Sequence, residues 1–410
     1  MGFEVKSIGE VCSVGDGAHS KVTRVETGIP YLTSKNIGQG FLKLDKLDYI
    51  SEESFEKLFS KDSKATRRPQ AGDVLFGIIG SFGNTYLYKE SDFFGFSSSI
   101  GILRPNPELL DSEYLYYVVS SKKFRDNHAN HNSGSVQGYT NIPTVKGLPL
   151  PVPSIAVQKK IAKVLQSLDR KIAVNQQTNQ TLEAMAQAIF KSWFVDFDPV
   201  KAKMRGEQPE GMDEATASLF PEKLVESELG LIPEGWEAVQ IGDIVERLKP
   251  KKRYTKKQVE PYGKTPVYEQ GASILLGFHN DDAGFDASPE EPVFIFGDHT
   301  CITHLSCSKF DISSNVIPLK GSIRPTIWTY YAIQGKQEFQ EYRRHWSEFI
   351  IKGVVLPPIE LAEKYAELVT TNYLMMESLK RQSKELEQLR DTLLPKLLSG
   401  EIELETEKEQ

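Results

Sequence analysis

The sequence predicts an α+β protein: two β-rich α/β domains joined by two long helices that pack antiparallel as a coiled coil, with pseudo-two-fold symmetry. Three observations predict this architecture. A proline-rich joint followed by an amphipathic helix occurs twice, as "GLPLPVPSIAVQKKIAKVL" from Gly147 and "GVVLPPIELAEKYAELV" from Gly353. Each joint is followed by a long run of apolar residues at helical spacing. Each joint is also preceded by a β-rich segment of the same plan.

Residues 1–152 are expected to form the first domain, because short β-type runs such as "DVLFGII" and "SSSIGILRP" are separated by Gly, Asn, Asp and Pro. Residues 236–357 follow the same plan, with "EPVFIFG" and "SSNVIPLKG", and form the second domain. Each domain also contains a helical stretch, and their first residues match, "VKSIGEVCSV" against "AVQIGDIVERL". A whole unit is therefore written twice. The alternative is that two unrelated α/β domains look alike in such patterns.

The two helical segments are residues 153–198 and 358–400, the first being one long helix or a closely broken pair. At about 1.5 Å per residue, the first helix would be roughly 60 Å long. Neither apolar face can remain in water, so we expect the helices to pack on each other. The apolar positions that define the two faces are Ile161, Val164, Leu165, Leu168, Ile172, Leu182, Met185, Ile189 and Trp193, and then Leu361, Tyr365, Leu368, Met375, Leu379, Leu386, Leu389 and Leu393.

Residues 199–235 are polar, acidic and rich in Pro and Gly, which predicts a linker that lies over a surface rather than in a core. Residues 401–410 are expected to form an acidic tail. The net charge of −7 over 410 residues arises mainly from these two regions, so each charge-balanced domain can still present a basic face to DNA. A tandem repeat with antiparallel helices imitates a dimer, and dimeric DNA readers meet half-sites about 34 Å apart.

Composition also indicates the compartment. The three cysteines are too few and too unevenly placed for a disulfide framework, which fits a reducing environment. No apolar run approaches the roughly 18 residues that span a bilayer, and the first residues lack the pattern of a signal peptide. We therefore expect a cytoplasmic protein without a membrane partner.

The densest basic cluster is "KPKKRYTKK", which suits neutralisation of DNA phosphates. The alternative is a solvated loop. Its basic residues are Lys249, Lys251, Lys252, Arg253, Lys256 and Lys257. The corresponding segment of the first domain, "GDGAHSK", offers only His19 and Lys21, so the two domains need not grip DNA in the same way.

A second candidate in the second domain is "YRRHWSEF", with Arg343, Arg344 and His345. An arginine fork matches guanine O6 and N7 in the major groove, whereas Trp346 is expected to pack internally. The first domain has the loop "NSGSVQGYTN" at this place, where Ser133, Ser135 and Gln137 have the chemistry to read adenine or phosphate. The alternative is that these residues simply build turns.

Two further motifs have structural alternatives. The aromatic residues Phe190, Trp193 and Phe194 end the first helix and either receive a partner or pack in the core. In "HTCITHLSC" the four zinc-type ligands His299, Cys301, His304 and Cys307 lack the usual paired spacing, so we interpret them as strand and turn residues. "GIIGSFGN" lacks the ending of a nucleotide-binding loop. The sequence shows no methyltransferase tetrapeptide, Walker motif or nuclease carboxylate cluster, which favours a non-catalytic chain.

Residues 187–237, "QAIFKSWFVDFDPVKAKMRGEQPEGMDEATASLFPEKLVESELGLIPEGWE", closely resemble the central region of type I restriction-modification specificity subunits. "PLPVPSIAVQKKIAKVLQSLDRKI" and "LPPIELAEKY" resemble the joints to that family's two helices, and the whole chain fits its plan. The second joint departs from the family pattern, with "ELAEKYAEL" where a Gln-Lys pair is more typical. This departure bears on the second docking surface.

The resemblance implies two target-recognition domains that read a bipartite, asymmetric site in double-stranded DNA, with the helices as a spacer. It implies docking of two methyltransferase subunits, and of motor-nuclease subunits for cleavage. S-adenosylmethionine, ATP and Mg are then expected on those partners, with no cofactor on this chain. In this family "YLTSKNIGQG" resembles part of the DNA-facing side, which makes Ser34, Lys35 and Asn36 candidates. The alternative function is a coiled-coil protein–protein adaptor without base readout.

Overall fold

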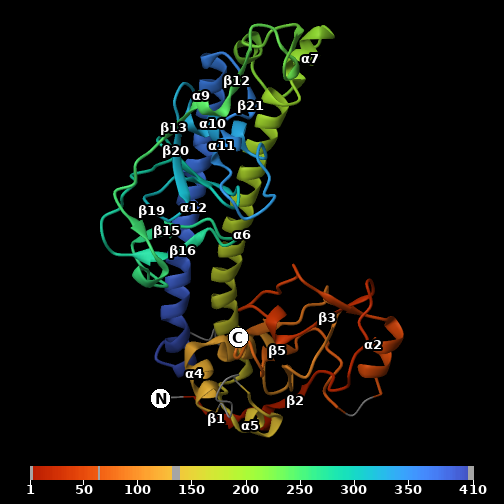
Figure 1. Ribbon diagram of the computed structural model, residues 1–410. Helices are drawn as coiled ribbons and strands as arrows, with labels where there is room; N and C mark the ends of the chain where they lie inside the picture. Colours follow the sequence, from red (N-terminus) through yellow and green to blue (C-terminus); the bar gives the residue numbers. More distant parts are fainter. Residues whose placement is uncertain (1–2, 63–64, 132–138, 405–410) are drawn as a thin grey trace. The chain divides into compact units, whose positions relative to one another are not determined.

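The computed structural model of the chain describes residues 3–62, 65–131 and 139–404 (Figure 1). The chain divides into two compact units. Unit 1 comprises Met1–Ile172 and Lys384–Gln410, and unit 2 comprises Ala173–Ser383. Both predicted long helices are present, as α6 (Ile155–Phe194) and α12 (Ile359–Ser399), and each contributes one segment to each unit.

Unit 1 contains a sheet in the order β2-β8-β5-β6, a smaller sheet β4-β3-β7 and the pair β1-β9. The strands are β1 (Val5–Ser7), β2 (Cys12–Asp16), β3 (Ile29–Leu32), β4 (Asp48–Ile50), β5 (Val74–Gly77), β6 (Thr85–Leu87), β7 (Gly95–Phe96), β8 (Ile100–Pro105) and β9 (Pro149–Pro151). The helices are α1 (Ile8–Val11), the 3-10 turn η1 (Ser34–Asn36), α2 (Glu52–Leu58), α3 (Ser112–Ser120), α4 (Lys122–Asn130) and α5 (Ile142–Gly147).

Unit 2 contains a sheet in the order β13-β20-β17-β18, a second sheet β14-β19-β15-β16, and the pairs β12-β21 and β10-β11. Its strands are β10 (Leu224–Ser227), β11 (Gly230–Pro233), β12 (Glu237–Gln240), β13 (Val245–Arg247), β14 (Arg253–Tyr254), β15 (Thr265–Tyr268), β16 (Leu275–His279), β17 (Val293–Gly297), β18 (Thr303–Ser306), β19 (Asp311–Ser313), β20 (Val316–Gly321) and β21 (Gly353–Leu356). Its helices are α7 (Asp198–Met204), α8 (Glu214–Ser218), α9 (Ile241–Ile244), the 3-10 turn η2 (Lys256–Gln258), α10 (Thr326–Ile333) and α11 (Trp346–Phe349).

The strand pairings confirm the internal repeat that the sequence predicts. The pairs β2-β8, β5-β8 and β5-β6 of unit 1 are antiparallel, as are β13-β20, β17-β20 and β17-β18 of unit 2. In the second sheets β3 runs parallel to β7 and antiparallel to β4, and β15 runs parallel to β19 and antiparallel to β16. The strand before each long helix, β9 or β21, pairs antiparallel with the strand that begins its repeat, β1 or β12.

Each long helix begins in the core of one unit and ends in the core of the other. In unit 1, Ile161, Leu165 and Leu397 belong to one buried cluster with residues of the main sheet. In unit 2, the α6 residue Phe190 and the α12 residue Tyr365 share a cluster with α10. Burying these apolar faces is what keeps the helices together.

Contacts inside each unit show that the helix segments run antiparallel. In unit 2, the Tyr365 hydroxyl donates to Ala186 O at 3.1 Å, while Asn175 Nδ2 donates to Ser383 Oγ at 3.2 Å, so rising α6 numbers meet falling α12 numbers. In unit 1, Arg390 Nη1 donates to Asp169 Oδ1 at 2.9 Å.

The expected apolar face is wrong at some positions of both helices. Met185, Leu368, Met375 and Leu389 are each more than two-fifths exposed. The buried positions between Tyr365 and Met376 are instead Val369 and Tyr373. Steps of four, four and three residues keep these side chains on one helical face, whereas Leu368 and Met375 fall beside it.

The interpretation of residues 199–235 as a linker without core residues is corrected by the structure. This segment forms α7, α8 and the β10-β11 hairpin, and Val200 and Phe220 are buried at 0% and 1% exposure. Phe220 packs edge-on against Trp193 with ring centroids 5.4 Å apart. Most of its polar residues are exposed, while a few widely spaced apolar residues join the core of unit 2. Among the described residues of the chain, no helix is both long and apolar enough to cross a membrane.

Candidate nucleic-acid interface

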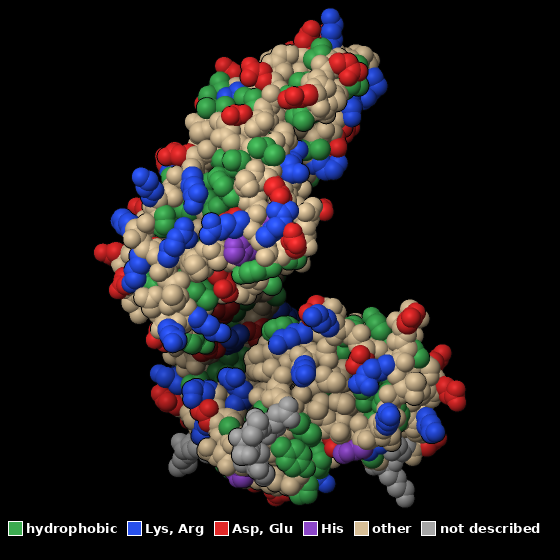
Figure 2. All heavy atoms as spheres, in the orientation of Figure 1, with side chains coloured by type: hydrophobic (Ala, Val, Ile, Leu, Met, Phe, Trp, Pro, Cys, Tyr) green, Lys and Arg blue, Asp and Glu red, His purple; other side chains and the backbone are tan. Residues whose placement is uncertain are grey.

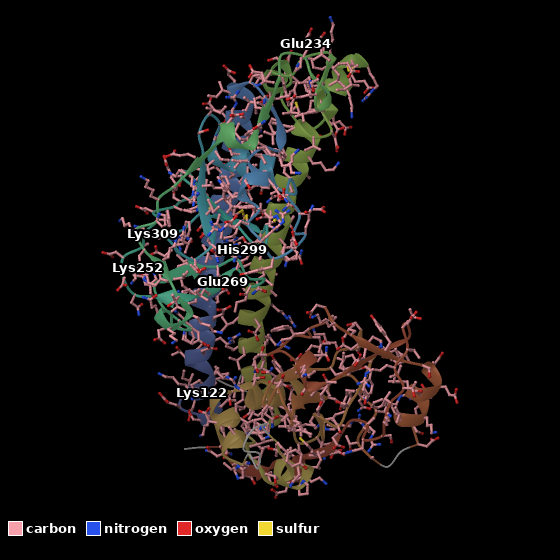
Figure 3. All side chains as sticks on the ribbon, in the orientation of Figure 1. Lys122, Glu234, Lys252, Glu269, His299 and Lys309 are labelled. Carbon is pink, nitrogen blue, oxygen red and sulfur yellow. The ribbon has the colours of Figure 1, made fainter. Side chains whose placement is uncertain are left out.

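The basic loop of unit 2 runs from the end of β13 through β14 into η2, and it contains five lysines and one anchored arginine. The guanidinium of Arg253 donates from Nη1 to Ser313 O at 2.7 Å and to Val316 O at 2.8 Å, so it holds the loop against the sheet. Burial lowers the pKa of Arg253. All six basic residues of the cluster are exposed, Arg253 together with Lys249, Lys251, Lys252, Lys256 and Lys257. Of the labelled side chains, Lys252 and Lys309 point outward from the same side of unit 2 (Figure 3).

A buried stack supports this loop. Lys252 Nζ lies 4.2 Å from the ring centroid of Tyr254, and that ring stacks on His279 with centroids 4.2 Å apart and planes inclined by 8°. His279 Nε2 lies 3.1 Å from Asp311 Oδ2, which also accepts the N–H of Gly284 at 2.9 Å. Burial, then the charges of Asp311 and Asp281, raise the pKa of Tyr254 to about 12. The ammonium group of Lys252 is therefore held at the surface by the buried side chains of Tyr254, His279 and Asp311 below it.

A groove of about 580 Å³ lies beside the loop, lined by Lys251, Lys264, Lys309 and Gly284 among others. Two of its lysines face carboxylates, since Lys264 Nζ lies 3.7 Å from Asp282 and Lys309 Nζ lies 3.2 Å from Asp286. Figure 2 shows many Lys and Arg side chains over this part of unit 2. The surface suits an extended polyanion better than a compact anion, because the nearby carboxylates offset part of the charge within the groove.

The neighbouring arginines Arg343 and Arg344 have opposite roles. Arg343 Nη1 donates to Glu348 Oε1 at 2.5 Å, and its Nε lies 2.7 Å from Glu341 Oε1. These bonds, led by that to Glu348, raise the pKa of Arg343. The side chain of Arg344 is 79% exposed, with Asp298 Oδ2 at 3.8 Å. Arg344 is thus the arginine of this motif that can reach a ligand.

His345 does not face solvent, which corrects its assignment to an interface. Its side chain is fully buried, and His345 Nε2 lies 3.0 Å from Glu341 O. Its N–H donates to Asp298 O at 2.8 Å, which ties the loop to the end of β17. The next residue, Trp346, lies under Arg247, whose guanidinium carbon is 5.7 Å from the ring. Arg247 immediately precedes the basic loop, so this contact joins the two basic segments of unit 2.

In unit 1 the motif "YLTSKN" mainly builds a turn. Asn36 Oδ1 accepts from Thr33 N at 2.9 Å, and its Nδ2 donates to Lys43 O at 3.1 Å. Ser34 is 4% exposed and its hydroxyl bonds to Ile79 O. Burial and these bonds leave Ser34 and Asn36 with structural roles, which corrects their assignment to a DNA surface. Lys35 is exposed and stays a candidate.

The remaining candidates of unit 1 lie in two other places. His19 is exposed and its Nε2 is 2.8 Å from Asp16 Oδ2, while Lys21 is exposed. Ser133, Ser135 and Gln137 lie outside the described residues. Directly after them, Tyr139 is 43% exposed. No local sequence pattern marks this position, because one tyrosine within a Ser- and Gly-rich stretch has no periodicity.

The aromatic residues at the end of α6 belong to the core of unit 2, which corrects their assignment to a partner surface. Phe190, Trp193 and Phe194 are 7%, 6% and 5% exposed. Phe194 packs against Trp328 and Tyr365 with ring centroids 6.0 Å and 5.5 Å apart. Their spacing along α6 faces them inward, toward α10 and α12.

The histidines and cysteines of "HTCITHLSC" are not gathered around one point. His304 lies in β18 and meets Tyr268 edge-on at 4.7 Å, and burial lowers the pKa of His304 to about 4. His299 meets Tyr342 instead, at 4.7 Å. Across the part of the chain that the structure describes, no three His, Cys, Asp or Glu residues form a group that could hold a metal ion.

Two of the residues that support the interface could not have been found from the sequence. His279 and Asp311 are separated by 32 positions and meet only because β16 and β19 belong to one sheet. Their sequence surroundings, "LLGFH" and "DIS", show ordinary strand patterns. By contrast, a run of lysines is visible locally.

Comparison with known proteins gives concordant results. Residues 1–184 match the family model described as the type I restriction modification DNA specificity domain. The chain is 30% identical over 224 residues to the type I restriction enzyme HindI specificity subunit of Haemophilus influenzae, over 44% of this chain and 49% of that protein. It is 24% identical to the MjaIX specificity subunit of Methanocaldococcus jannaschii, over 98% and 93% of the two chains. The crystal structure of an S subunit of a type I restriction-modification system from M. genitalium has a similar fold, with a TM-score of 0.52, 16% identity and 96% coverage of both chains.

Proposed function

The chain belongs to the family of type I restriction-modification specificity subunits, and from this premise we propose that it selects the DNA site on which a multisubunit modification and restriction enzyme acts. The internal repeat is the observation that supports this proposal most strongly. The main sheets of the two domains have the same strand order, whereas the segments after their first strands differ, with "KPKKRYTKK" against "GDGAHSK", as expected of two readers of unlike sequences. The exposed lysines of the basic loop suit phosphate contacts, and Arg344 suits a base contact.

The proposed target is a bipartite, asymmetric site in double-stranded DNA, with one half read by each domain. The two long helices would act as an antiparallel coiled-coil spacer that relates the domains by approximate two-fold symmetry and sets the distance between half-sites. The antiparallel contacts inside each unit, such as Tyr365 to Ala186 and Arg390 to Asp169, support this role. Inserting one or two helical turns after residue 180 is then expected to lengthen the unread spacer.

The proposal assigns catalysis to partners. Two methyltransferase subunits would dock on this chain, and motor-nuclease subunits would join them for cleavage, all in the cytoplasm. S-adenosylmethionine, ATP and Mg would be bound by those partners. The purified chain alone is expected to leave DNA unmethylated and uncut, and methyl transfer should appear when the methyltransferase subunits of its host are added. Methylation by the chain alone would contradict this assignment.

Selection from a library of randomised duplexes tests the function directly. The full chain, with its host's methyltransferase subunits, is mixed with the library at low salt, and the bound duplexes are sequenced. Two short, unlike motifs at a fixed separation are expected. Binding to the subunits without enrichment of any DNA sequence would contradict the proposal and favour a protein–protein adaptor.

A further inference from the structure

The backbone places Tyr139 of unit 1 and Arg344 of unit 2 at the same position of the repeat. In unit 1 the residue after Tyr139 donates its N–H to Ile78 O at 3.0 Å, one residue beyond the end of β5. In unit 2 the residue after Arg344 donates its N–H to Asp298 O at 2.8 Å, one residue beyond the end of β17. β5 and β17 are equivalent in strand order, so the two residues are equivalent in the fold.

The segments that follow these residues also correspond. A short helix, α5 or α11, leads in each unit to the strand that pairs with the strand that begins its repeat, β1 or β12. The turn before that strand accepts an equivalent backbone bond, since Ile8 N donates to Leu148 O and Ile241 N donates to Lys352 O, each at 2.9 Å. The match therefore extends over the whole segment and does not depend on one hydrogen bond.

The residue that follows each of these positions is buried, while the position itself is exposed. Thr140 and His345 are buried at 1% and 0% exposure, whereas Tyr139 is 43% exposed and the Arg344 side chain 79%. Around Arg344 the loop is clamped twice. Asp298 Oδ1 accepts from Trp346 N at 3.0 Å, and Arg343 bridges Glu341 and Glu348. An exposed side chain on a clamped backbone suits base readout, because the side chain must enter the groove in one orientation.

Resting on the function proposed above, we propose that Tyr139 and Arg344 are the corresponding base-reading positions of the two domains, and that Arg344 reads a guanine in the half-site of unit 2. A guanidinium can donate two bonds at once to guanine O6 and N7. A tyrosine hydroxyl donates only one. One position of the repeat thus imposes different requirements on the two half-sites.

Arg344→Lys is the sharpest variant, because lysine keeps the charge and loses the fork. In the duplex selection, Arg344→Lys should lose the guanine preference at one position of one half-site and leave the other half unchanged. Its affinity for the wild-type site should fall about 10- to 100-fold, and the fall should largely vanish on a duplex whose guanine is replaced. Lys223→Ala, which removes an exposed charge of unit 2 outside these loops, should keep the complete motif.

Three results would overturn the inference. The first is that Arg344→Lys retains the wild-type motif at every position. The second is that Arg344→Ala binds every sequence more weakly and lowers the slope of log affinity against log salt by about 0.9, which would assign Arg344 to a phosphate. The third concerns Tyr139→Arg, a gain-of-function variant that should add a guanine requirement to the other half-site. If no guanine is added, Tyr139 and Arg344 are not equivalent reading positions. If the wild-type complex selects no bipartite motif, the proposed function itself fails, which is a different result from these three.

Discussion

The two joints at which the long helices begin solve one problem with different residues. In unit 1, Gln158 is fully buried on the first turn of α6, and its Nε2 donates to Pro153 O at 2.7 Å and to Leu109 O at 2.9 Å. In unit 2 the matching carbonyl, Pro357 O, accepts from Arg324 Nε at 3.0 Å and Nη2 at 2.6 Å. Ala362 takes the place of Gln158 there, equally buried.

At both joints a proline carbonyl accepts a hydrogen bond from a side chain, but different residues donate it. A buried carbonyl without a donor is costly, so some donor must be present at each joint. The difference between the joints also revises the meaning of "ELAEKYAEL" in the second joint. The residue at the position of the missing glutamine, Ala362, is buried inside unit 2. The replacement therefore changes an internal contact and not a docking surface.

The largest expected effect comes from Tyr365, which belongs to the second joint. Its ring is fully buried among Phe190, Phe194 and Tyr331, so Tyr365→Ala should lower the free energy of unfolding of unit 2 by about 4 kcal/mol. Tyr365→Phe, which removes only the bond to Ala186 O, should cost about 1 kcal/mol. Peptide-resolved hydrogen exchange measures both. A loss below 1 kcal/mol for Tyr365→Ala would refute the assigned core.

The next effect concerns Gln158. Gln158→Ala should lower the free energy of unfolding of unit 1 by about 3 kcal/mol, because Asp111 N, Leu109 O and Pro153 O lose their partner together. Hydrogen exchange of peptides from α3 and the start of α6 should report it. Gln176→Ala, at an exposed position of the same helix, is the control and should change little. Equal protection from hydrogen exchange in both variants would contradict the stabilising role of Gln158.

Arg324→Ala should have a smaller effect, about 1.5 kcal/mol on unit 2, because the side chain is only partly buried and water can replace it at Pro357 O. Denaturant unfolding of unit 2 is the measurement. A loss as large as that of Gln158→Ala would mean that the two joints are equivalent in energy as well as in geometry.

The last expected effect, a pH dependence of unit 1, is absent near neutral pH. Burial lowers the pKa of His128 to about 4, and the ring stacks on Phe82 with centroids 4.0 Å apart. The unfolded chain, with a histidine pKa near 6.5, binds the proton more readily than the folded unit. The contribution of His128 is therefore complete above about pH 6.5 and declines as pH falls toward 4, by at most about 1.4 kcal/mol per pH unit. His128→Gln should flatten that decline between pH 6.5 and 5, and an unchanged pH profile would contradict it.

The sequence predicts the fold wherever the pattern is local. Proline joints, helical periodicity and strand-like runs mark both units, because each depends on residues a few positions apart. The segment 199–235 was misassigned since Val200 and Phe220 reach the core from a polar stretch. The exposure of Met185 and Leu368 was missed because periodicity alone does not say where the partner helix lies.

The candidate interface is less predictable, because charge is local whereas accessibility is tertiary. The lysines of the basic loop are exposed as expected, but Arg253 is anchored by backbone carbonyls more than fifty residues away. Arg343 and Arg344 are neighbours with the same chemistry, and the carboxylates of Glu341 and Glu348 decide which of them is engaged. His345, Ser34 and Asn36 have side chains that suit DNA but are used by the fold itself.

The central claim is that each unit reads its own half of a bipartite site. Its most direct test is to replace residues 236–357 with the second domain of another specificity subunit and to determine the DNA motif methylated by the reconstituted complex. One half of the motif should change and the other half should persist. A change in both halves, or in neither, would contradict the account.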